Sequence, residues 1–230
     1  AGRAARLHAL RGRHGVGQGQ AHLLAQQPGK AVRTQHHPAM PWRDIPAFVQ
    51  QHLRPGNRPE VVRSLLEFVI LTACRSGEAR GMTWSEVDLE NKIWTIPAER
   101  MKAKLAHRVP LSARALAILE AQKDQHDALV FPSVRDQVAL SDMAITALLR
   151  RQKAHSDTPG RIATAHGFRS SFRDWCSEKG YSRDLAERSL AHTIKDKVEA
   201  AYHRTDLLEQ RRNLMNAWGA FVTGKLTTKW

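Results

Sequence analysis

The chain of 230 residues contains little cysteine, few tyrosines and no long apolar run. Its two cysteines, Cys74 and Cys176, each stand among apolar neighbours. This setting favours buried reduced thiols over a structural disulfide. The most apolar stretch, residues 64–74, contains Glu67 and is too short to cross a bilayer, which takes about 20 apolar residues. No apolar core with a cleavage site follows the N-terminal arginines, so we expect no secretory signal and a cytoplasmic location.

Negative charge is scarce as well. The chain has 22 acidic and 36 basic side chains, a formal charge of +14. Because the basic residues are spread along the whole sequence, a nucleic acid is favoured over an anionic membrane as partner. A merely basic protein is the alternative. The hydrophobic content of 42% is typical of a globular chain, and this length allows one sizeable core.

The sequence divides into three parts. Residues 1–35 are rich in Gly, Gln, His and Arg, contain no acidic residue and lack a sustained period, which predicts a poorly ordered basic arm or linker remnant. Residues 36–222 carry regular patterns and are expected to form one ordered domain. Residues 223–230 are expected to be a C-terminal tail.

The pattern within the ordered part predicts a mainly α fold with a small antiparallel β-sheet, an α+β class. Strands are expected at 93–96 and 107–111, with 101–105 as a middle strand or turn. Ser76 is expected to cap a short helix that has Glu78 in its first turn. The other expected helices span residues 44–53, 59–74, 112–124, 141–151, 163–179, 182–191, 195–202 and 205–222.

Two helices carry apolar stripes that indicate core packing. In the helix expected at 163–179, Phe168, Phe172 and Trp175 lie at spacings of four and three, so they share one face. The last helix has a similar stripe, formed by Leu207, Leu214, Trp218 and Phe221.

His166 and Arg169, three residues apart, are expected on a neighbouring face of the same helix. An imidazole and a guanidinium suit one phosphate, because the guanidinium presents two parallel donors and the imidazole can donate or accept a proton. The His-x-x-Arg spacing is common, however, and a solvated helix face explains it equally.

Arg75 ends an apolar helix and has Glu78 three residues further on. The pair either tethers a helix end or orients Arg75 toward an anion. Lys102 and Lys104 lie in the expected hairpin, where a lysine either reaches a neighbouring cleft or is simply solvated.

Twelve histidines raise the question of a metal site. They lack the paired cysteines or the His-Glu-x-x-His spacing of zinc sites, so no metal is expected. Tyr202 stands in a polar setting, whereas Tyr181 has the context of a turn contact.

Taken together, these residues resemble the tyrosine recombinase family, and within it the integrases of temperate phages and integrative islands. The resemblance covers roughly residues 36–221. It rests on the segments Leu71-Thr72-Ala73-Cys74-Arg75-Ser76-Gly77-Glu78, Trp94 to Lys102, Arg108-Val109-Pro110-Leu111-Ser112, His166-Gly167-Phe168-Arg169, Leu190-Ala191-His192, Ala200-Ala201-Tyr202 and Arg211-Arg212-Asn213-Leu214-Met215.

The resemblance implies a catalytic, DNA breaking and rejoining role for residues 36–222. Tyr202 would be the nucleophile and would form a 3′-phosphotyrosyl bond. Arg75 and Arg169 would hold the non-bridging phosphate oxygens, with Glu78 orienting Arg75. His166 would act as general base or proton shuttle.

The resemblance further implies that His192 donates to the phosphate and that Lys102 protonates the leaving 5′-oxygen. Lys102 is preferred to Lys104 because it lies eight residues before Pro110, as the family's hairpin lysine does. Neither metal, ATP nor another cofactor is implied. The implied partners are a double-stranded DNA attachment site and further copies of the full-length protein on DNA, in a bacterial cytoplasm.

The sequence also departs from the family pattern, because a helical core-binding domain normally precedes the catalytic half. Only about 35 uninformative residues precede it here, so a catalytic fragment is expected. Two other functions stay open. One is DNA relaxation like that of a type IB topoisomerase, although the sequence near Met101 and Arg211 is more similar to integrases. The other is a catalytically decayed DNA-binding fragment.

Overall fold

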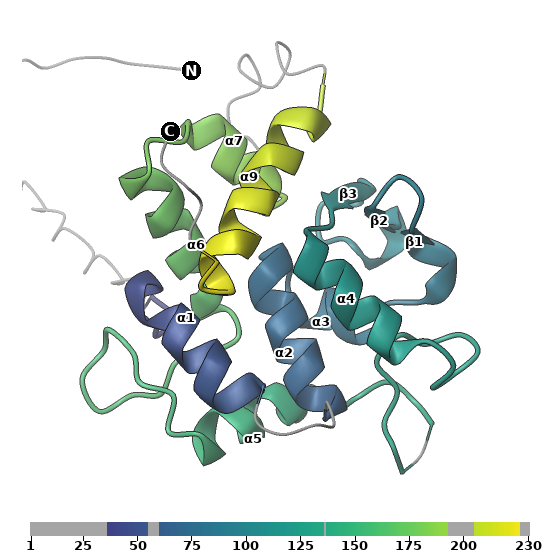
Figure 1. Cartoon of the computed structure of the whole chain (residues 1–230), viewed down its shortest axis with the longest axis horizontal. Helices are drawn as coiled ribbons and strands as arrows, with labels where there is room; N and C mark the ends of the chain where they lie inside the picture. The colour runs from purple at the N-terminus through teal and green to yellow at the C-terminus, as the bar shows by residue number, and fades with distance from the viewer. Residues whose placement is uncertain (1–35, 55–59, 136, 193–204, 226–230) are drawn as a thin grey trace, which may run out of the picture. The chain divides into compact units, whose positions relative to one another are not determined.

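The computed structural model describes residues 36–54, 60–135, 137–192 and 205–225. The predicted arm at 1–35, the predicted helix at 195–202 and residues 226–230 of the predicted tail lie outside this part. The described residues are mainly helical and include one small antiparallel sheet (Figure 1), so the predicted fold class is confirmed. None of the helices in this part is both long and apolar enough to span a membrane.

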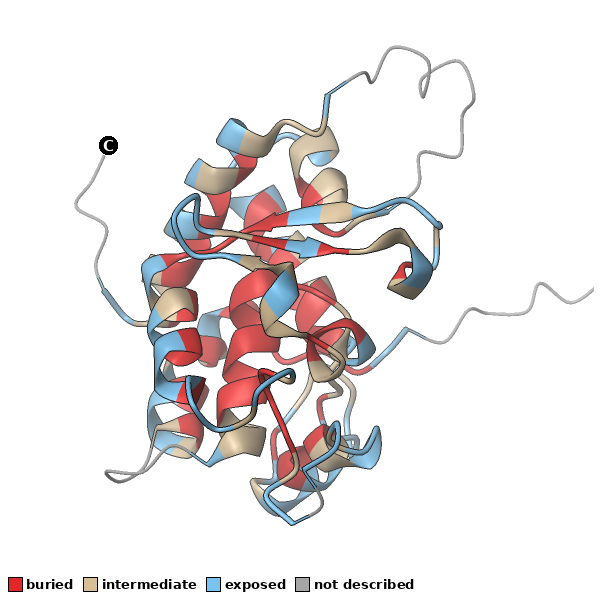
Figure 2. Cartoon of the chain, turned by 90° about the vertical axis from the view of Figure 1, so that its right-hand side faces the viewer, coloured by how far each residue is buried: buried red, intermediate tan, exposed pale blue. Residues whose placement is uncertain are grey.

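Helix α2 (Val61–Thr72) is the centre of the fold. It is apolar on nearly every side, and such a helix is stable only when other elements cover it. It contacts α4 (Ala113–Gln122), α5 (Met143–Arg151), α6 (Gly167–Glu178) and α9 (Leu208–Val222). Figure 2 shows the consequence, because the central helices are almost entirely buried while the outer helices are buried on one side only.

A buried carboxylate holds α2 to its neighbours. Glu67 is 1% exposed and accepts hydrogen bonds from Arg54 and from Arg114 of α4. Burial by itself raises the pKa of Glu67, but the hydrogen bonds from Arg114 and Arg54 outweigh it and lower the pKa below its ordinary value. Removing these arginines would leave a buried carboxylate without its partners, which is destabilising. The one charged side chain within the apolar stretch at 64–74 is therefore a structural tie.

The predicted N-terminal helix at 44–53 is confirmed as a continuous helical run. It consists of η1 (Trp42–Asp44), α1 (Ile45–Phe48) and η2 (Val49–Leu53). The last five residues form a wider, π-type turn, and Ile45, Phe48, Val49 and Leu53 are all buried.

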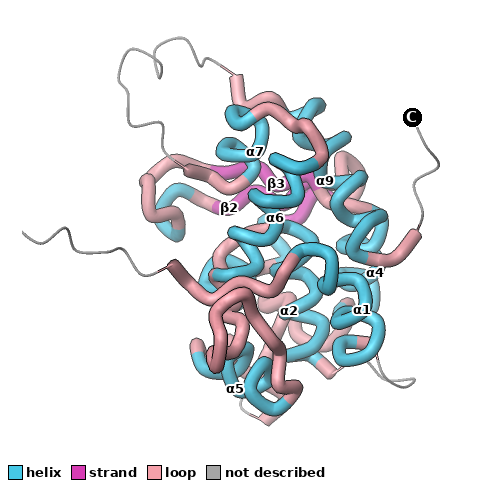
Figure 3. The backbone as a smooth tube through the Cα atoms, turned by 90° about the vertical axis from the view of Figure 1, so that its left-hand side faces the viewer, coloured by secondary structure: helices cyan, strands magenta, loops and turns pink. Residues whose placement is uncertain are grey.

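The sheet has three strands within the described residues, in the order β1 (Val87–Asp88), β2 (Ile93–Ile96) and β3 (His107–Pro110). All pairs are antiparallel, and β2 meets β3 with Ile93 opposite Pro110 and Ile96 opposite His107. β3 packs against α9, which also contacts α7 (Arg183–Ser189) (Figure 3). β1 was not predicted because two residues are too few for a period. Residues 101–105 form a turn and not the alternative strand.

Aromatic packing joins α6 to α9. Phe172 and Trp175 lie 5.4 and 5.1 Å from Trp218, measured between ring centroids. The aromatic face predicted for α6 is therefore confirmed. The stripe predicted for the last helix is confirmed at Leu214 and Trp218, whereas Leu207 precedes that helix in a left-handed conformation (φ 53°), so the helix begins three residues later than predicted.

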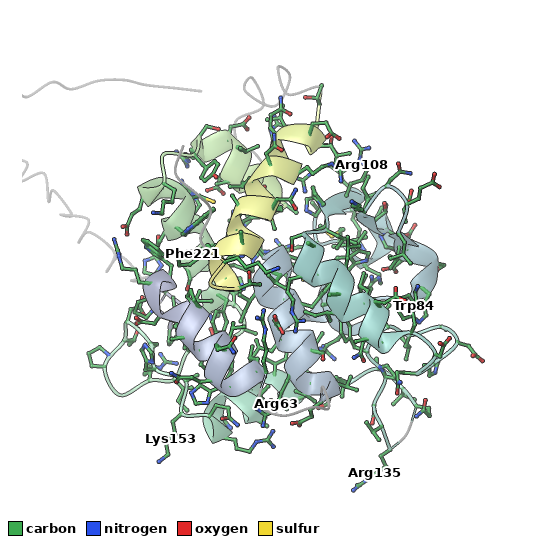
Figure 4. The ribbon with its side chains drawn as sticks, viewed as in Figure 1. Arg63, Trp84, Arg108, Arg135, Lys153 and Phe221 are labelled. Carbon is green, nitrogen blue, oxygen red and sulfur yellow. The ribbon has the colours of Figure 1, made fainter. Side chains whose placement is uncertain are left out.

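The start of α9 is anchored to the sheet. Arg108 of β3 lies beside it (Figure 4) and donates two hydrogen bonds to Asp206, at 2.9 and 2.8 Å. Arg211, 1% exposed, donates to the carbonyl of Arg108 at 2.6 Å. Asp206, which is four residues after Tyr202 in the sequence, is thereby tied to the sheet.

Both cysteines are free and buried, as predicted. Burial, with a smaller contribution from Glu78, raises the pKa of Cys74 to about 12, and burial raises the pKa of Cys176 to about 12 as well. Both thiols are therefore protonated at neutral pH, which makes them poor nucleophiles.

Helix α6 begins at Gly167, not at residue 163 as predicted, and His166 is its N-cap residue. The hydroxyl of Thr164 accepts the Gly167 N–H at 2.9 Å. A Cβ atom at Gly167 would lie 2.0 Å from the carbonyl oxygen of Pro38. Because Gly167 has no side chain, the backbone at Pro38 and Ala39 can pass close to α6.

We predict that Gly167→Ala destabilises the fold by about 1–3 kcal/mol, because backbone must move to admit the methyl group. The shift in urea unfolding midpoint measures this. Gly77→Ala is the matched control, since its Cβ would meet nothing closer than Arg80 Nη2 at 3.9 Å and alanine is the better helix former. Equal midpoints for the two variants would contradict the close approach at Gly167.

Candidate active site

One buried carboxylate fixes Arg75 at both ends. Glu78 accepts the backbone N–H of Arg75 at 2.7 Å through Oε2 and its Nη1 at 2.8 Å through Oε1. Arg75 is therefore the N-cap residue of α3 (Ser76–Arg80), and the prediction that Ser76 caps this helix was wrong. The Glu78 side chain is 6% exposed and that of Arg75 is 29% exposed, so the guanidinium is both tethered and partly open to solvent.

Arg169 lies in α6 and is 3% exposed. Its Nη1 donates to the carbonyl of Ala73, and its Nη2 donates to the carbonyl of Leu190 at 2.6 Å. The same Nη2 lies 3.1 Å from Nε2 of His192. One guanidinium thus joins the end of α2, helix α6 and the segment after α7.

Two alanines next to these carbonyls adopt the left-handed conformation, Ala73 with φ 50° and Ala191 with φ 49°. This conformation costs a non-glycine residue roughly 1–2 kcal/mol. The turns at Ala73 and Ala191 place the carbonyls of Ala73 and Leu190 where Arg169 can reach them.

Burial and then the nearby charge of Arg75 lower the pKa of Arg169 to about 10. Arg169 still carries a full charge at neutral pH. Two guanidinium groups that oppose each other in this way are stabilised when an anion lies between them. The pair therefore indicates an anion site.

His166 is exposed at the N-cap of α6, and its ring centroid lies 4.3 Å from that of His37. Desolvation of the ring, followed by the charges of His37, Arg169 and Arg75, lowers the pKa of His166 to about 4. The imidazole is therefore neutral at pH 7 and can accept a proton. His166 stands one residue before the helix but has helical backbone angles (φ −69°, ψ −35°), and its carbonyl accepts the Arg169 N–H at 3.0 Å, so the predicted i, i+3 relation to Arg169 is kept.

His192 follows α7 and is held from two sides. Its Nδ1 lies 2.5 Å from Oε2 of Glu187, and its Nε2 faces Arg169. The structure therefore brings together five predicted site residues: Arg75, Glu78, His166, Arg169 and His192.

Lys102 is exposed in the turn between β2 and β3, and its amine has no partner within the described residues. Lys104 differs, because its Nζ donates back to the carbonyl of Glu99 at 3.4 Å. No hydrogen bond or ion pair joins Lys102 to the five clustered residues within the described part of the chain. Tyr202 lies outside the described residues.

Two residues that support this site were not singled out from the sequence. Arg100, two residues before Lys102, donates to the carbonyl of Glu78 at 2.9 Å and so ties the turn to α3. Glu187 holds His192. Arg100 could have been found from the sequence, because it lies in the segment from Trp94 to Lys102 that resembles the family. For Glu187 no local sequence pattern indicates that it pairs with His192, five residues further on.

The model of the phage integrase family matches residues 44–207. The chain belongs to this family. The predicted resemblance to phage-type tyrosine recombinases is thereby confirmed, and the family match includes Arg75, Lys102, His166, Arg169, His192 and Tyr202.

Similar proteins support the assignment to the phage integrase family. Prophage integrase IntA of Escherichia coli K12 is 37% identical over 163 residues, which is 70% of this chain and 38% of IntA. Prophage integrase IntZ of the same strain is 37% identical over 189 residues, 81% of this chain and 45% of IntZ. The chain thus spans less than half the length of these two curated relatives. The lambda integrase catalytic core has the same fold, with a TM-score of 0.52 at 20% identity over 69% of this chain and 96% of that core.

We predict that the His166 ring shows no titration midpoint between pH 5.5 and 8 in NMR spectra of the folded protein, because its pKa lies at about 4. In the unfolded protein it should titrate near pH 6.5. The unfolded state then binds more protons between these values, so His166 reduces stability as pH falls from about 6.5 to about 4.

His166→Gln identifies the resonance. Because His37 contributes to the lowering, His37→Gln should move the midpoint upward. A midpoint at or above 6.5 in the folded protein would contradict this assignment of the ring's surroundings.

Proposed function

We propose that this chain provides the catalytic domain of a site-specific DNA recombinase of the integrase type, which breaks and rejoins DNA through a covalent bond to Tyr202. The observation that supports this most directly is the convergence of Arg75 and Arg169 beside two imidazoles. A phosphodiester is the anion that this family's name and the charge of +14 point to.

In the proposed cleavage step, the Tyr202 oxygen attacks phosphorus and the bond from phosphorus to the 5′-oxygen breaks. The tyrosine proton passes to neutral His166, and the Lys102 ammonium gives a proton to the leaving oxygen. The product is a 3′-phosphotyrosyl bond and a free 5′-hydroxyl. Because the phosphotyrosyl bond conserves the energy of the ester, attack by another 5′-hydroxyl completes strand exchange without ATP.

The charges around the phosphate contribute in two ways. Arg75 and Arg169 offset the charge that builds on the non-bridging oxygens in the transition state. The phosphate also counters the positive charges that lower the pKa of His166, so that pKa rises when DNA binds. A stronger base is then available when the tyrosine must lose its proton.

The proposed partners are a duplex attachment site and further copies of the whole protein. A lambda integrase dimer bound to a COC′ core site shares the fold, with a TM-score of 0.53 at 23% identity. A lambda integrase tetramer bound to a Holliday junction does so too, at 0.53 and 20%. Assembly on DNA is therefore part of this proposal.

We predict that a nicked suicide duplex carrying the attachment-site core forms a protein–DNA adduct on denaturing gels, because loss of the short nicked product prevents religation. The adduct should vanish in Tyr202→Phe and persist in Tyr181→Phe, the matched tyrosine control. An adduct that survives Tyr202→Phe would exclude this nucleophile.

Two further measurements would favour the other functions. Site-independent relaxation of supercoiled DNA would indicate topoisomerase activity. Salt-sensitive binding without any adduct would indicate a decayed DNA-binding fragment, since phosphate contacts weaken steeply with ionic strength.

We predict that Lys102→Ala slows cleavage about 10²–10⁴-fold, the usual worth of a general acid. Lys104→Ala should have little effect. A substrate whose leaving 5′-oxygen is replaced by sulfur should restore the rate of Lys102→Ala, because a thiolate leaves without protonation. Failure of the sulfur substrate to rescue this variant would show that Lys102 is not the acid.

A further inference from the structure

We propose that Glu187, supported by Arg173, is a positioning residue that sets the orientation and proton position of the His192 ring. This inference rests on the proposed function, since it concerns the same phosphate site. Glu187 belongs to α7 and Arg173 to α6, so the arrangement depends on how these two helices pack.

The two oxygens of Glu187 have different partners. Oε2 lies 2.5 Å from Nδ1 of His192, and Oε1 accepts a hydrogen bond from Nε of Arg173 at 2.7 Å. Burial raises the pKa of Glu187, but hydrogen bonds from Arg173 and His192 reverse the effect and leave it below its ordinary value. The carboxylate is therefore ionised at neutral pH and can only accept hydrogen bonds.

The position of the ring proton follows from the partners at its two ends. Arg169 can only donate, so the Nε2 atom that faces it at 3.1 Å must carry the lone pair. Ionised Glu187 can only accept, so Nδ1 must carry the proton. Both ends demand the same tautomer, and in a histidine the bond at one ring nitrogen decides the state of the other.

This tautomer affects what His192 can do for a phosphate. When a phosphate oxygen takes the Arg169 donor, the Nε2 lone pair is released and can take a proton from solvent. The ring then donates from Nε2 to the phosphate and from Nδ1 to Glu187, and its charge lies between two anions. The charged or titratable groups that act here are Arg169 and His166 from α6 and its N-cap, Arg173 from α6 and Glu187 from α7.

Glu187→Gln tests this with a change of one atom. Arg173 cannot accept, so the glutamine oxygen stays with Arg173 and its amide donates toward Nδ1. Nδ1 must then accept, which moves the ring proton to Nε2, where it opposes Arg169. In Arg173→Leu/Glu187→Gln the amide is free to turn its oxygen to Nδ1, so the original tautomer returns.

The proton position is read from ¹⁵N NMR spectra of the His192 ring in the free protein, and cleavage is read from the adduct assay. We expect an Nδ1–H ring in the unaltered chain, an Nε2–H ring and at least about tenfold slower cleavage in Glu187→Gln, and recovery of the tautomer in the double variant. Glu178→Gln is the matched control, because Glu178 also accepts from an arginine, Arg43, but is remote from His192; it should change neither reading.

An Nε2–H ring in the unaltered chain would overturn the proposal. So would a Glu187→Gln variant with unchanged tautomer and cleavage, or a double variant that does not recover the tautomer, since a merely structural Arg173–Glu187 pair predicts no rescue. If the unaltered chain forms no adduct, the proposed function fails, while the ring spectra still decide the role of Glu187.

Discussion

The interaction on which the rest of the site depends is the burial of one guanidinium, that of Arg169. A buried charge needs hydrogen-bond acceptors, and those of the two terminal nitrogens of Arg169 come from segments far apart in sequence, whereas its Nε has no partner within the described residues. The acceptors are the carbonyl of Ala73, the carbonyl of Leu190 and the ring of His192. Because all three meet one planar group, its geometry determines how the end of α2, helix α6 and the segment after α7 lie relative to one another.

This requirement explains features that local preference would oppose. Ala73 and Ala191 hold left-handed conformations next to the two carbonyls, and the hydrogen bonds to Arg169 compensate the strain. The core supports the arrangement, since the buried carboxylate of Glu67 ties α2 to its neighbours through ion pairs with Arg54 and Arg114. A packed helix therefore supports the site, and two of its turns hold the left-handed residues.

Sequence patterns captured those parts of the molecule that depend on near neighbours. The apolar run of α2, the aromatic face of α6 and the pairing of β2 with β3 follow from residue spacing alone. Contacts across the chain were missed. One such contact is the approach of Pro38 to Gly167, where the Pro38 carbonyl also accepts the Thr164 N–H. The cap of α3 was missed for a local reason, because the Glu78 carboxylate accepts the Arg75 N–H and makes Arg75 the cap. Five of the residues that the family resemblance implied lie together in the structure, whereas Glu187 became visible only from the packing of α6 against α7.

Two carboxylates have the same role in the site, since each holds one hydrogen-bonding side chain in position. Glu78 holds Arg75 and Glu187 holds His192, and each carboxylate uses its other oxygen elsewhere, on a backbone N–H or on Arg173. Glu78 and Glu187 thereby hold Arg75 and His192 in place. The remaining hydrogen-bonding positions of Arg75 and His192 stay available to an incoming anion. The two carboxylates fix the orientation of these groups before an anion binds. An anion that binds between the cationic groups then relieves their mutual repulsion. Electrostatic preorganisation of this kind is most effective where charge develops during a reaction, and the proposed attack on a phosphodiester is such a reaction.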